Sequence, residues 1–589
     1  MGTGFTVDTP LKVARYGISS AISLDDNLVE QMREYHCKRA DEPYEKISNK
    51  AEDSRARRIT AYLNLLDRLV KKQVVALQAS PFEEGSEITK YYRLLPESPL
   101  KRLYNSMVES TDPEAKRLAQ EELRRRAIPG SIDVNIMAKA DRDLYRGGIK
   151  LPPEYALAMA ALRGYAKSTL RSSIIFSAGM NQRLYSYIGH FDDFFPDKNG
   201  ILPKKIILKV SDFRSAIIQG KILAKRGLWI SEYRVESGLN CGGHAFPSKG
   251  SLIGTILKEF KEKKSELIDQ LNEMYYKALT KLGKNSVGLP YSMRITVQGG
   301  IGTADENQLL HELFEVDGTG WGTPFLLVPE VTNVDDDHLN KLIKATDKDV
   351  LLSESSPLGA PFWNLHDSAS EEARRQRISS GKPGCACPQG FLVSNTEFSE
   401  IPICTASRTY QKAKLISLLK EGLSSQKIKL MKESILKKSC ICRDLGGAVR
   451  VKNDIDPDAK PAICCGPNII NFNKIASLEE LIDHIYGRIS HFTNPDRPHM
   501  FIRELMLNVD YLRSEIEKFS QGLISRKPKY FQEFKENLLK GIDYYQHLAD
   551  KYVEEFKEHH QLDIKALQNI RETIENIQLV FKPAACVKT

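Results

Sequence analysis

One stretch of the chain reads Met293-Arg-Ile-Thr-Val-Gln-Gly-Gly-Ile-Gly-Thr303 and, after a short helical run, Val316-Asp-Gly-Thr-Gly-Trp-Gly-Thr-Pro-Phe-Leu-Leu327. The β-branched residues Ile295 and Val297 end at a Gly-Gly pair, which indicates a strand that runs into a tight turn. A second short strand ends in the glycine-rich turn 317–323. Such turns expose backbone N–H groups, and a helix N-terminus adds partial positive charge. Together they favour binding of a phosphate group.

The residues on the N-terminal side of this stretch alternate between strand and helix patterns. Strands are predicted over 204–210 and 228–235, and helices over 212–226 and 252–282. This alternation predicts an α/β fold with a parallel sheet. Because the phosphate site of a (β/α)8 TIM barrel follows strands 7 and 8, two successive glycine turns favour that barrel.

A chain of 589 residues predicts several domains. We expect first barrel elements in 1–25, a helical insertion in 26–170, the barrel core in 171–370, a cysteine-rich module in 371–470 and a helical C-terminal region in 471–589. In the last region, apolar residues recur at helical spacing, which indicates a bundle core or the surface of a homodimer.

The composition favours a soluble protein. The net charge of +9 arises from 85 basic and 76 acidic residues, a mild excess that does not by itself indicate nucleic-acid binding. The N-terminus lacks the pattern of a signal peptide, and no apolar run approaches the roughly 20 residues of a membrane span. We expect a cytoplasmic protein.

A second motif follows the strand predicted over 228–235. It contains Gly242 and Gly243, which let a ligand approach the backbone, and then His244. Active sites of barrels lie at the C-terminal ends of the strands, where this loop is placed. A histidine there can accept a proton from a carbon acid or hold an anionic oxygen.

Three segments together resemble the nitronate monooxygenase family: Ser237-Gly-Leu-Asn-Cys-Gly-Gly-His244, Gln298-Gly-Gly-Ile-Gly-Thr303 and Trp321-Gly-Thr-Pro-Phe-Leu326. That family and the related flavin-dependent enoyl-acyl carrier protein reductases are FMN-binding TIM barrels. The resemblance covers about 200–365, and the helical insertion and the cysteine-rich region lie outside it.

The resemblance implies FMN as the cofactor, His244 as the catalytic histidine and a small-molecule substrate. It also implies two phosphate turns, which are formed by Gly299, Gly300 and Gly302 and by Gly322 and Thr323. Two alternatives stay open. One is a flavin reductase of an unsaturated substrate, fed by NAD(P)H or by an iron–sulfur cluster. The other is a non-enzymatic or RNA-associated protein that uses the basic insertion.

Cysteine usage is uneven. Seven of the ten cysteines lie in one region: Cys385, Cys387, Cys404, Cys440, Cys442, Cys464 and Cys465. In a cytosolic protein such clustering favours metal or redox chemistry, and thiolates suit an iron–sulfur cluster or zinc. The spacing is not that of a zinc ribbon. The alternative is a set of reduced, partly buried thiols.

Overall fold

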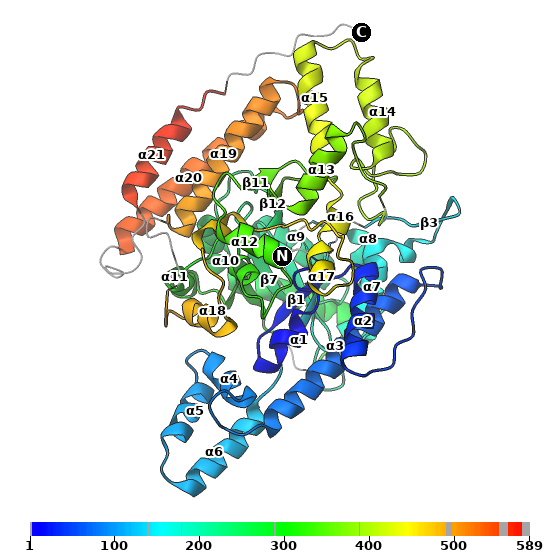
Figure 1. Ribbon diagram of the computed structural model, residues 1–589. Helices are drawn as coiled ribbons and strands as arrows, with labels where there is room; N and C mark the ends of the chain where they lie inside the picture. Colours follow the sequence, from blue (N-terminus) through cyan, green and yellow to red (C-terminus); the bar gives the residue numbers. More distant parts are fainter. Residues whose placement is uncertain are drawn as a thin grey trace.

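The centre of the molecule is a sheet of seven parallel strands (Figure 1). The computed structural model describes residues 3–137, 141–177, 179–287, 290–387, 389–490, 497–552 and 563–579. In spatial order the strands are β1 (Ser20–Ser23), β2 (Ile132–Ile136), β5 (Ser173–Phe176), β6 (Lys205–Val210), β7 (Ile230–Glu236), β9 (Arg294–Gln298) and β10 (Gly318–Gly320). The α/β class with a parallel sheet, which the sequence predicts, is confirmed.

The spatial order of the strands is also their order in the chain. Right-handed crossovers between successive parallel strands then place the connecting helices on one face, as in a barrel. The helices are α7 (Leu157–Ala166), α8 (Gln182–Ile188), α9 (Phe213–Ala224), α10 (Ile253–Leu282) and α11 (Ala304–Phe314). Tyr233 of β7 is fully buried against this layer and donates a hydrogen bond to the Ala216 carbonyl of α9. Gly220 makes room for it, because a Cβ there would lie 2.3 Å from the tyrosine oxygen.

The predicted closed (β/α)8 barrel is corrected. Within the described residues, β10 and β1 are the two edges of the sheet and do not pair, and no eighth strand joins them. After β10 the chain turns at Gly322 into the 3-10 helix Thr323–Leu327. Pro324 occupies the first turn of that helix, where its fixed φ and missing N–H favour a helical start over a further strand.

The N-terminal segment occupies the open side instead. Phe5 accepts a hydrogen bond from the backbone N–H of Asn333, and the Thr9 hydroxyl donates to the Val331 carbonyl. An apolar cluster that includes Tyr16, Val328 and Ile482 packs beside these bonds. Isolated hydrogen bonds and apolar packing therefore replace the strand ladder that would close a barrel.

The region expected as a helical insertion, 26–170, is helical only in part. Its helices are α2 (Asp26–Arg39), α3 (Ser54–Ala79), α4 (Glu87–Leu94), α5 (Pro99–Glu109), α6 (Pro113–Arg126) and α7. Strand β2 also lies in this region and pairs with β1 and β5. Its sequence, Ile132-Asp-Val-Asn-Ile136, has buried apolar residues at every second position, a short signal beside the long helices.

The residues after the sheet form smaller elements. Strand β8 (Gly243–His244) pairs with β12 (Phe362–Leu365), which pairs antiparallel with β11 (Val350–Ser353). The remaining elements are the short helix α1 (Thr9–Val13), a hairpin of β3 (Tyr145–Arg146) and β4 (Ile149–Lys150), and the helices α12 (Asp336–Ile343), α13 (Ala369–Ser379), α14 (Arg408–Leu418), α15 (Ser425–Lys437), α16 (Ile441–Asp444) and α17 (Gly447–Lys452). Helices α14 and α15 pack against each other as a projecting pair (Figure 1).

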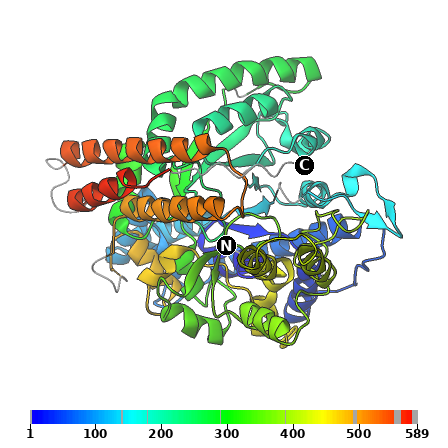
Figure 2. The same ribbon diagram turned by 90° about the horizontal axis from the view of Figure 1, so that it is seen from above.

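The C-terminal region is helical: α18 (Leu478–Ile485), α19 (Met500–Ser520), α20 (Pro528–Tyr552) and α21 (Ile564–Glu575). Helices α19 to α21 pack side by side in both views (Figures 1 and 2). A homodimer through these helices stays a prediction. Among the described helices, none is both long and apolar enough to cross a membrane.

Glu504 of α19 links these helices to the sheet. Its carboxyl is 1% exposed and accepts hydrogen bonds from the Ser237 hydroxyl and the backbone N–H of Ile253, at 2.8 and 2.9 Å. Burial raises the pKa of Glu504 to about 7, and its hydrogen bonds oppose the shift. The folded state therefore favours the protonated carboxyl.

We predict that Glu504 makes stability pH-dependent. Because its folded pKa is raised, its contribution is fully present below the unfolded value of about 4.3 and is lost as pH rises through about 7. Chemical unfolding between pH 4 and pH 8 should show wild type losing stability relative to Glu504→Gln. The exposed Glu536→Gln is the control, and a pH-independent difference for Glu504→Gln would contradict the prediction.

Candidate functional site

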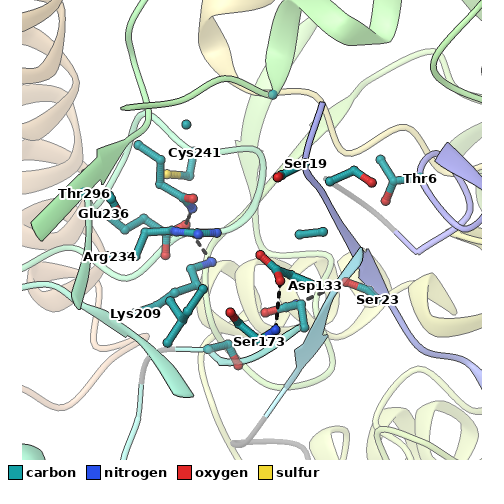
Figure 3. A pocket seen from close by; sticks show the side chains of 18 of the residues that line it. Thr6, Ser19, Ser23, Asp133, Ser173, Lys209, Arg234, Glu236, Cys241 and Thr296 are labelled. Atoms are coloured by element: carbon teal, nitrogen blue, oxygen red, sulfur yellow. Dashed lines mark hydrogen bonds and ion pairs between the residues drawn. The ribbon is translucent and has the colours of Figure 1, made fainter. Parts of the chain in front are cut away.

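The curled sheet encloses a cavity of about 1280 Å³. Alternate residues of its strands line the cavity, among them Asp133, Ser173, Lys209, Arg234, Glu236 and Thr296, as Figure 3 shows. Both edge strands contribute, β1 through Ser23 and β10 through Thr319. Inward side chains of a TIM barrel are mostly bulky and apolar, whereas these are polar and charged.

One part of this lining is a hydrogen-bonded network around Glu232 of β7, which is 5% exposed. Its carboxylate accepts hydrogen bonds from Arg234 and from the Thr296 hydroxyl, both at 2.7 Å. Burying charges is tolerable only when they are paired in this way. The wall of the cavity is therefore polar.

A second network lies where the strands end. Glu236 accepts hydrogen bonds from Lys209 at 2.8 Å and from the Gln298 amide at 2.6 Å. Burial by itself raises the pKa of a carboxyl, but the Lys209 ammonium and these hydrogen bonds hold the pKa of Glu236 below its ordinary value. Burial and the nearby Glu236 carboxylate raise the pKa of the Cys241 thiol well above its ordinary value. The mouth of the sheet thus holds an ion pair and a protonated thiol.

Glycine-rich loops converge above this network. A Cβ on Gly242 would lie 2.7 Å from the Cys464 carbonyl, and one on Gly466 would lie 2.7 Å from the Thr323 hydroxyl. These close approaches are the reason that glycine is needed at both positions. Six of the residues predicted to bind cofactor line the cavity: Gly242, Gly243, Gly299, Gly300, Gly322 and Thr323.

Asn240 stands out in the cavity wall. It is 2% exposed, and neither its amide nitrogen nor its amide oxygen has a hydrogen-bond partner among the described residues. Its nitrogen lies against the turn after β9, because a Cβ on Gly300 would come within 2.8 Å of it. A buried amide without partners costs free energy, so this side chain is poised for a polar ligand in the cavity.

Gly302 is placed differently from the other turn glycines. Its N–H donates to the carboxylate of Glu306 at 2.8 Å, and Arg497 covers it from outside. Glu306 also pairs with Arg497 at 2.6 Å. The chain's own carboxylate therefore takes the position that a phosphate oxygen would need at this glycine.

His244 lies on the cavity wall, as predicted. Strand pairing of β8 with Phe362 and Trp363 of β12 fixes its backbone. Its Nε2 lies 2.7 Å from the Ser356 hydroxyl, and the Phe362 ring contacts the imidazole edge-on at 4.9 Å. The ring is thus oriented by a hydroxyl and an aromatic neighbour.

The seven clustered cysteines separate into two groups. Cys464 and Cys465 belong to the loop that packs on Gly242 and Gly243. The other five, Cys385, Cys387, Cys404, Cys440 and Cys442, come together through thiol–thiol hydrogen bonds. Among the described residues, no three of these sulfurs lie within 4.8 Å of one another, so a metal site in the second group stays a prediction.

Another group with metal-ligand chemistry lies on α12 and consists of Asp335, Asp337 and His338. His338 Nδ1 donates to Asp335 at 2.7 Å, and its Nε2 accepts from the backbone N–H of Ala369. Asp335 also accepts from the backbone N–H of His338 as the cap of the helix. The histidine is fully engaged as a structural residue.

The sequence analysis did not identify Lys209, Glu236, Asn240 or Gln298 as site residues. A signal for Glu236 and Gln298 exists, because polar residues recur at every second position in the strands that end with them. That period places them on one face of the sheet. Asn240 is inconspicuous in the sequence, since its lack of partners arises only from the fold.

No protein-family model matches the chain, and no curated protein matches it. Among solved structures, the chain is similar to the enoyl reductase domain of MlnA from the macrolactin biosynthesis cluster of Bacillus amyloliquefaciens. The identity is 15% and the TM-score 0.34, with 76% of this chain and 88% of that chain covered. A likeness at this TM-score decides neither fold nor function.

We predict that Arg497 is needed to hold the turn after β9. Arg497→Met leaves the buried Glu306 carboxylate without its cation, which should reduce the free energy of unfolding by about 3–5 kcal/mol. Arg503→Met is the matched control, because Arg503 lies in the first turn of α19 and its partner Asp347 is exposed. Its loss of unfolding free energy should stay below about 1 kcal/mol. Equal losses in urea unfolding would contradict this role for Arg497.

Proposed function

We propose that this protein is an FMN-dependent oxidoreductase that resembles nitronate monooxygenases and acts on a small molecule in the cavity. The observation that carries the proposal is Asn240, whose buried and unpartnered amide lies in the cavity beside the Gly299–Gly300 turn. Such an amide suits a flavin, which offers both hydrogen-bond donors and acceptors. The cavity also exceeds the volume of an ordinary small-ligand site, so it has room for a cofactor together with a substrate.

The residues present fit FMN at two turns. Gly299 and Gly300 have φ values of 98° and 85°, a left-handed geometry that exposes the backbone to the cavity. Gly322 and Thr323 would hold the other side of the phosphate, at the start of a 3-10 helix. Gly302 is not part of this set, since Glu306 already binds its N–H. Bound FMN would supply exchange of a hydride or of single electrons.

His244 would act on the substrate as a general base or as the partner of an anionic oxygen. Because its ring is held by Ser356 and Phe362 on the cavity wall, it can accept a proton from a carbon acid or hold an anionic oxygen. Lys209 and Glu236 lie at the same mouth and would fix the charge distribution around the reacting atoms. The glycine loops and β12 would exclude water from the end of the cavity that they line.

The RNA-associated alternative is disfavoured by the insertion itself. Arg117 pairs with Glu114, and Arg125 and Arg126 both pair with Glu122. These basic side chains therefore face acidic partners on their own helix rather than forming an open basic surface. The flavin reductase alternative differs from the proposed function in its electron donor, so activity assays with different donors distinguish the two.

We predict that the protein copurifies with FMN and that Gly300→Asp loses it. A carboxylate beside the phosphate should weaken binding at least about tenfold. Gly300→Asn is the matched control, because both side chains tolerate the left-handed backbone while only aspartate adds charge. The flavin released by denaturation is identified by chromatography. Colourless protein that FMN cannot reconstitute would contradict the proposal.

We predict that His244→Ala retains FMN but reduces turnover by roughly 10²-fold or more, as expected for loss of a general base. Turnover is followed by flavin reoxidation and product formation with a short-chain nitronate in air, and separately with NAD(P)H and an unsaturated thioester. Ser356→Ala is the comparison, because it removes only the partner of the imidazole. Unchanged turnover in His244→Ala would reduce the histidine to a structural residue.

A further inference from the structure

Three segments distant in the sequence meet at the cysteine module. Cys385 and Ser407 form a parallel bridge, in which the N–H of Cys385 donates to the Ala406 carbonyl and the N–H of Arg408 donates to the Cys385 carbonyl. Gly384 permits this approach, since a Cβ there would lie 2.7 Å from the Arg408 backbone. Cys440 caps the N-terminus of α16, which carries Cys442. The backbone thus places Cys385 beside the segment that carries Cys404, and side-chain interactions place Cys440 next to both Cys385 and Cys442.

The thiols form two connected sets. Cys404 donates a hydrogen bond to Cys387. In the other set, Cys385 donates to Cys440, which donates to Cys442. Cys404 and Cys440 are 3% and 5% exposed, whereas Cys385, Cys387 and Cys442 are partly exposed. Cys404 belongs to the apolar core, and Cys387 and Cys442 pack against it.

Backbone N–H groups are directed at the sulfurs. The N–H of Cys387 donates to the Cys385 sulfur, that of Gly390 to Cys387, and that of Ala406 to Cys404. Cys387 adopts a left-handed conformation with φ of 51°, which is unusual for a residue other than glycine. Such hydrogen bonds stabilise thiolates and tune metal-bound sulfur.

A cation faces the cluster from the sheet. Arg142, which lies beyond the C-terminal end of β2, interacts electrostatically with Cys404. Its Nε is buried without a hydrogen-bond partner in the described part of the chain. A guanidinium in this position would offset the negative charge of several thiolates.

We propose that Cys385, Cys387, Cys404, Cys440 and Cys442 supply the ligands of an iron–sulfur cluster on the wall of the cavity. Cys442 lines that cavity together with Leu445 and Phe391. The metal site rests on the thiol arrangement alone and stands whether or not the cavity binds FMN.

The spread of the sulfurs favours a cluster over a single zinc ion. Tetrahedral Zn–S bonds of about 2.3 Å place four sulfurs about 3.8 Å apart. Among the described residues, no three of these sulfurs lie within 4.8 Å of one another. Contacting pairs that are separated from each other match ligands divided among two or more irons. Cys387 and Cys404 would supply two of four cluster ligands. Two of Cys385, Cys440 and Cys442 would supply the other two, so one of these three thiols would not be a ligand.

The test is metal and sulfide analysis of the full chain, prepared without oxygen and reconstituted with Fe²⁺ and sulfide. We expect about two or about four irons with equal acid-labile sulfide per chain, and an electron paramagnetic resonance signal after reduction with dithionite. Cys387→Ser and Cys404→Ser should each lose the iron, while one of Cys385→Ser, Cys440→Ser and Cys442→Ser should keep it. Cys37→Ser is the control, because Cys37 lies on α2 outside the cluster.

Three results would overturn the proposal. They are one zinc per chain with no sulfide, a Cys387–Cys404 disulfide with no metal, and iron that Cys387→Ser and Cys404→Ser retain. Circular dichroism of each variant separates loss of metal from loss of fold, and metal binding by folded wild type decides the case if all variants unfold. Iron without FMN, or FMN without iron, would separate this proposal from the flavin proposal.

Discussion

A buried carboxylate joins the turn after β9 to the start of the C-terminal helices. Glu306 is 2% exposed and accepts hydrogen bonds from the N–H of Gly302 and of Met500, at 2.8 and 2.6 Å, as well as from Arg497. It therefore stabilises the turn after β9, the N-terminal end of α11 and the start of α19 at once. The pKa of Glu306 stays below its ordinary value: burial opposes ionisation, but Arg497 and these donors outweigh it.

The interior of the sheet depends on the same kind of compensation. Glu232 and Glu236 are each paired with a cation on an adjacent or the same strand, so the cavity can stay polar without leaving a charge unpaired. Asn240 is the exception, since the fold leaves both ends of its amide without a partner. Among the described residues, the contrast between these paired charges and an amide with neither end bonded distinguishes the scaffold from the position where a ligand is needed.

The sequence predicted the individual strands and helices better than it predicted whether the sheet closes into a barrel. Strand 204–210 and helix 252–282 lie within one residue of β6 and α10, because the strand is a compact apolar run and the helix has a long, regular period. Strand β2 was missed because Asp133 and Asn135 face the cavity and interrupt a short run. The open edge depends on Pro324 and on contacts from the other end of the chain, which a local pattern does not contain. Likewise, spacing alone could not separate Cys464 and Cys465 from the five clustered thiols.

The way in which the open side is covered has a consequence for folding. The hydrogen bond from Thr9 to Val331 spans 322 residues, and Gly4 donates to the carbonyl of Leu445. Gly4 and Thr9 therefore reach these contacts only after the chain as far as Leu445 and Val331 has been made. Contacts of such long sequence separation form slowly, since loop-closure entropy must be overcome first. Until then the two edge strands stay uncovered, and the nascent protein is most exposed to mispairing with other chains at this seam.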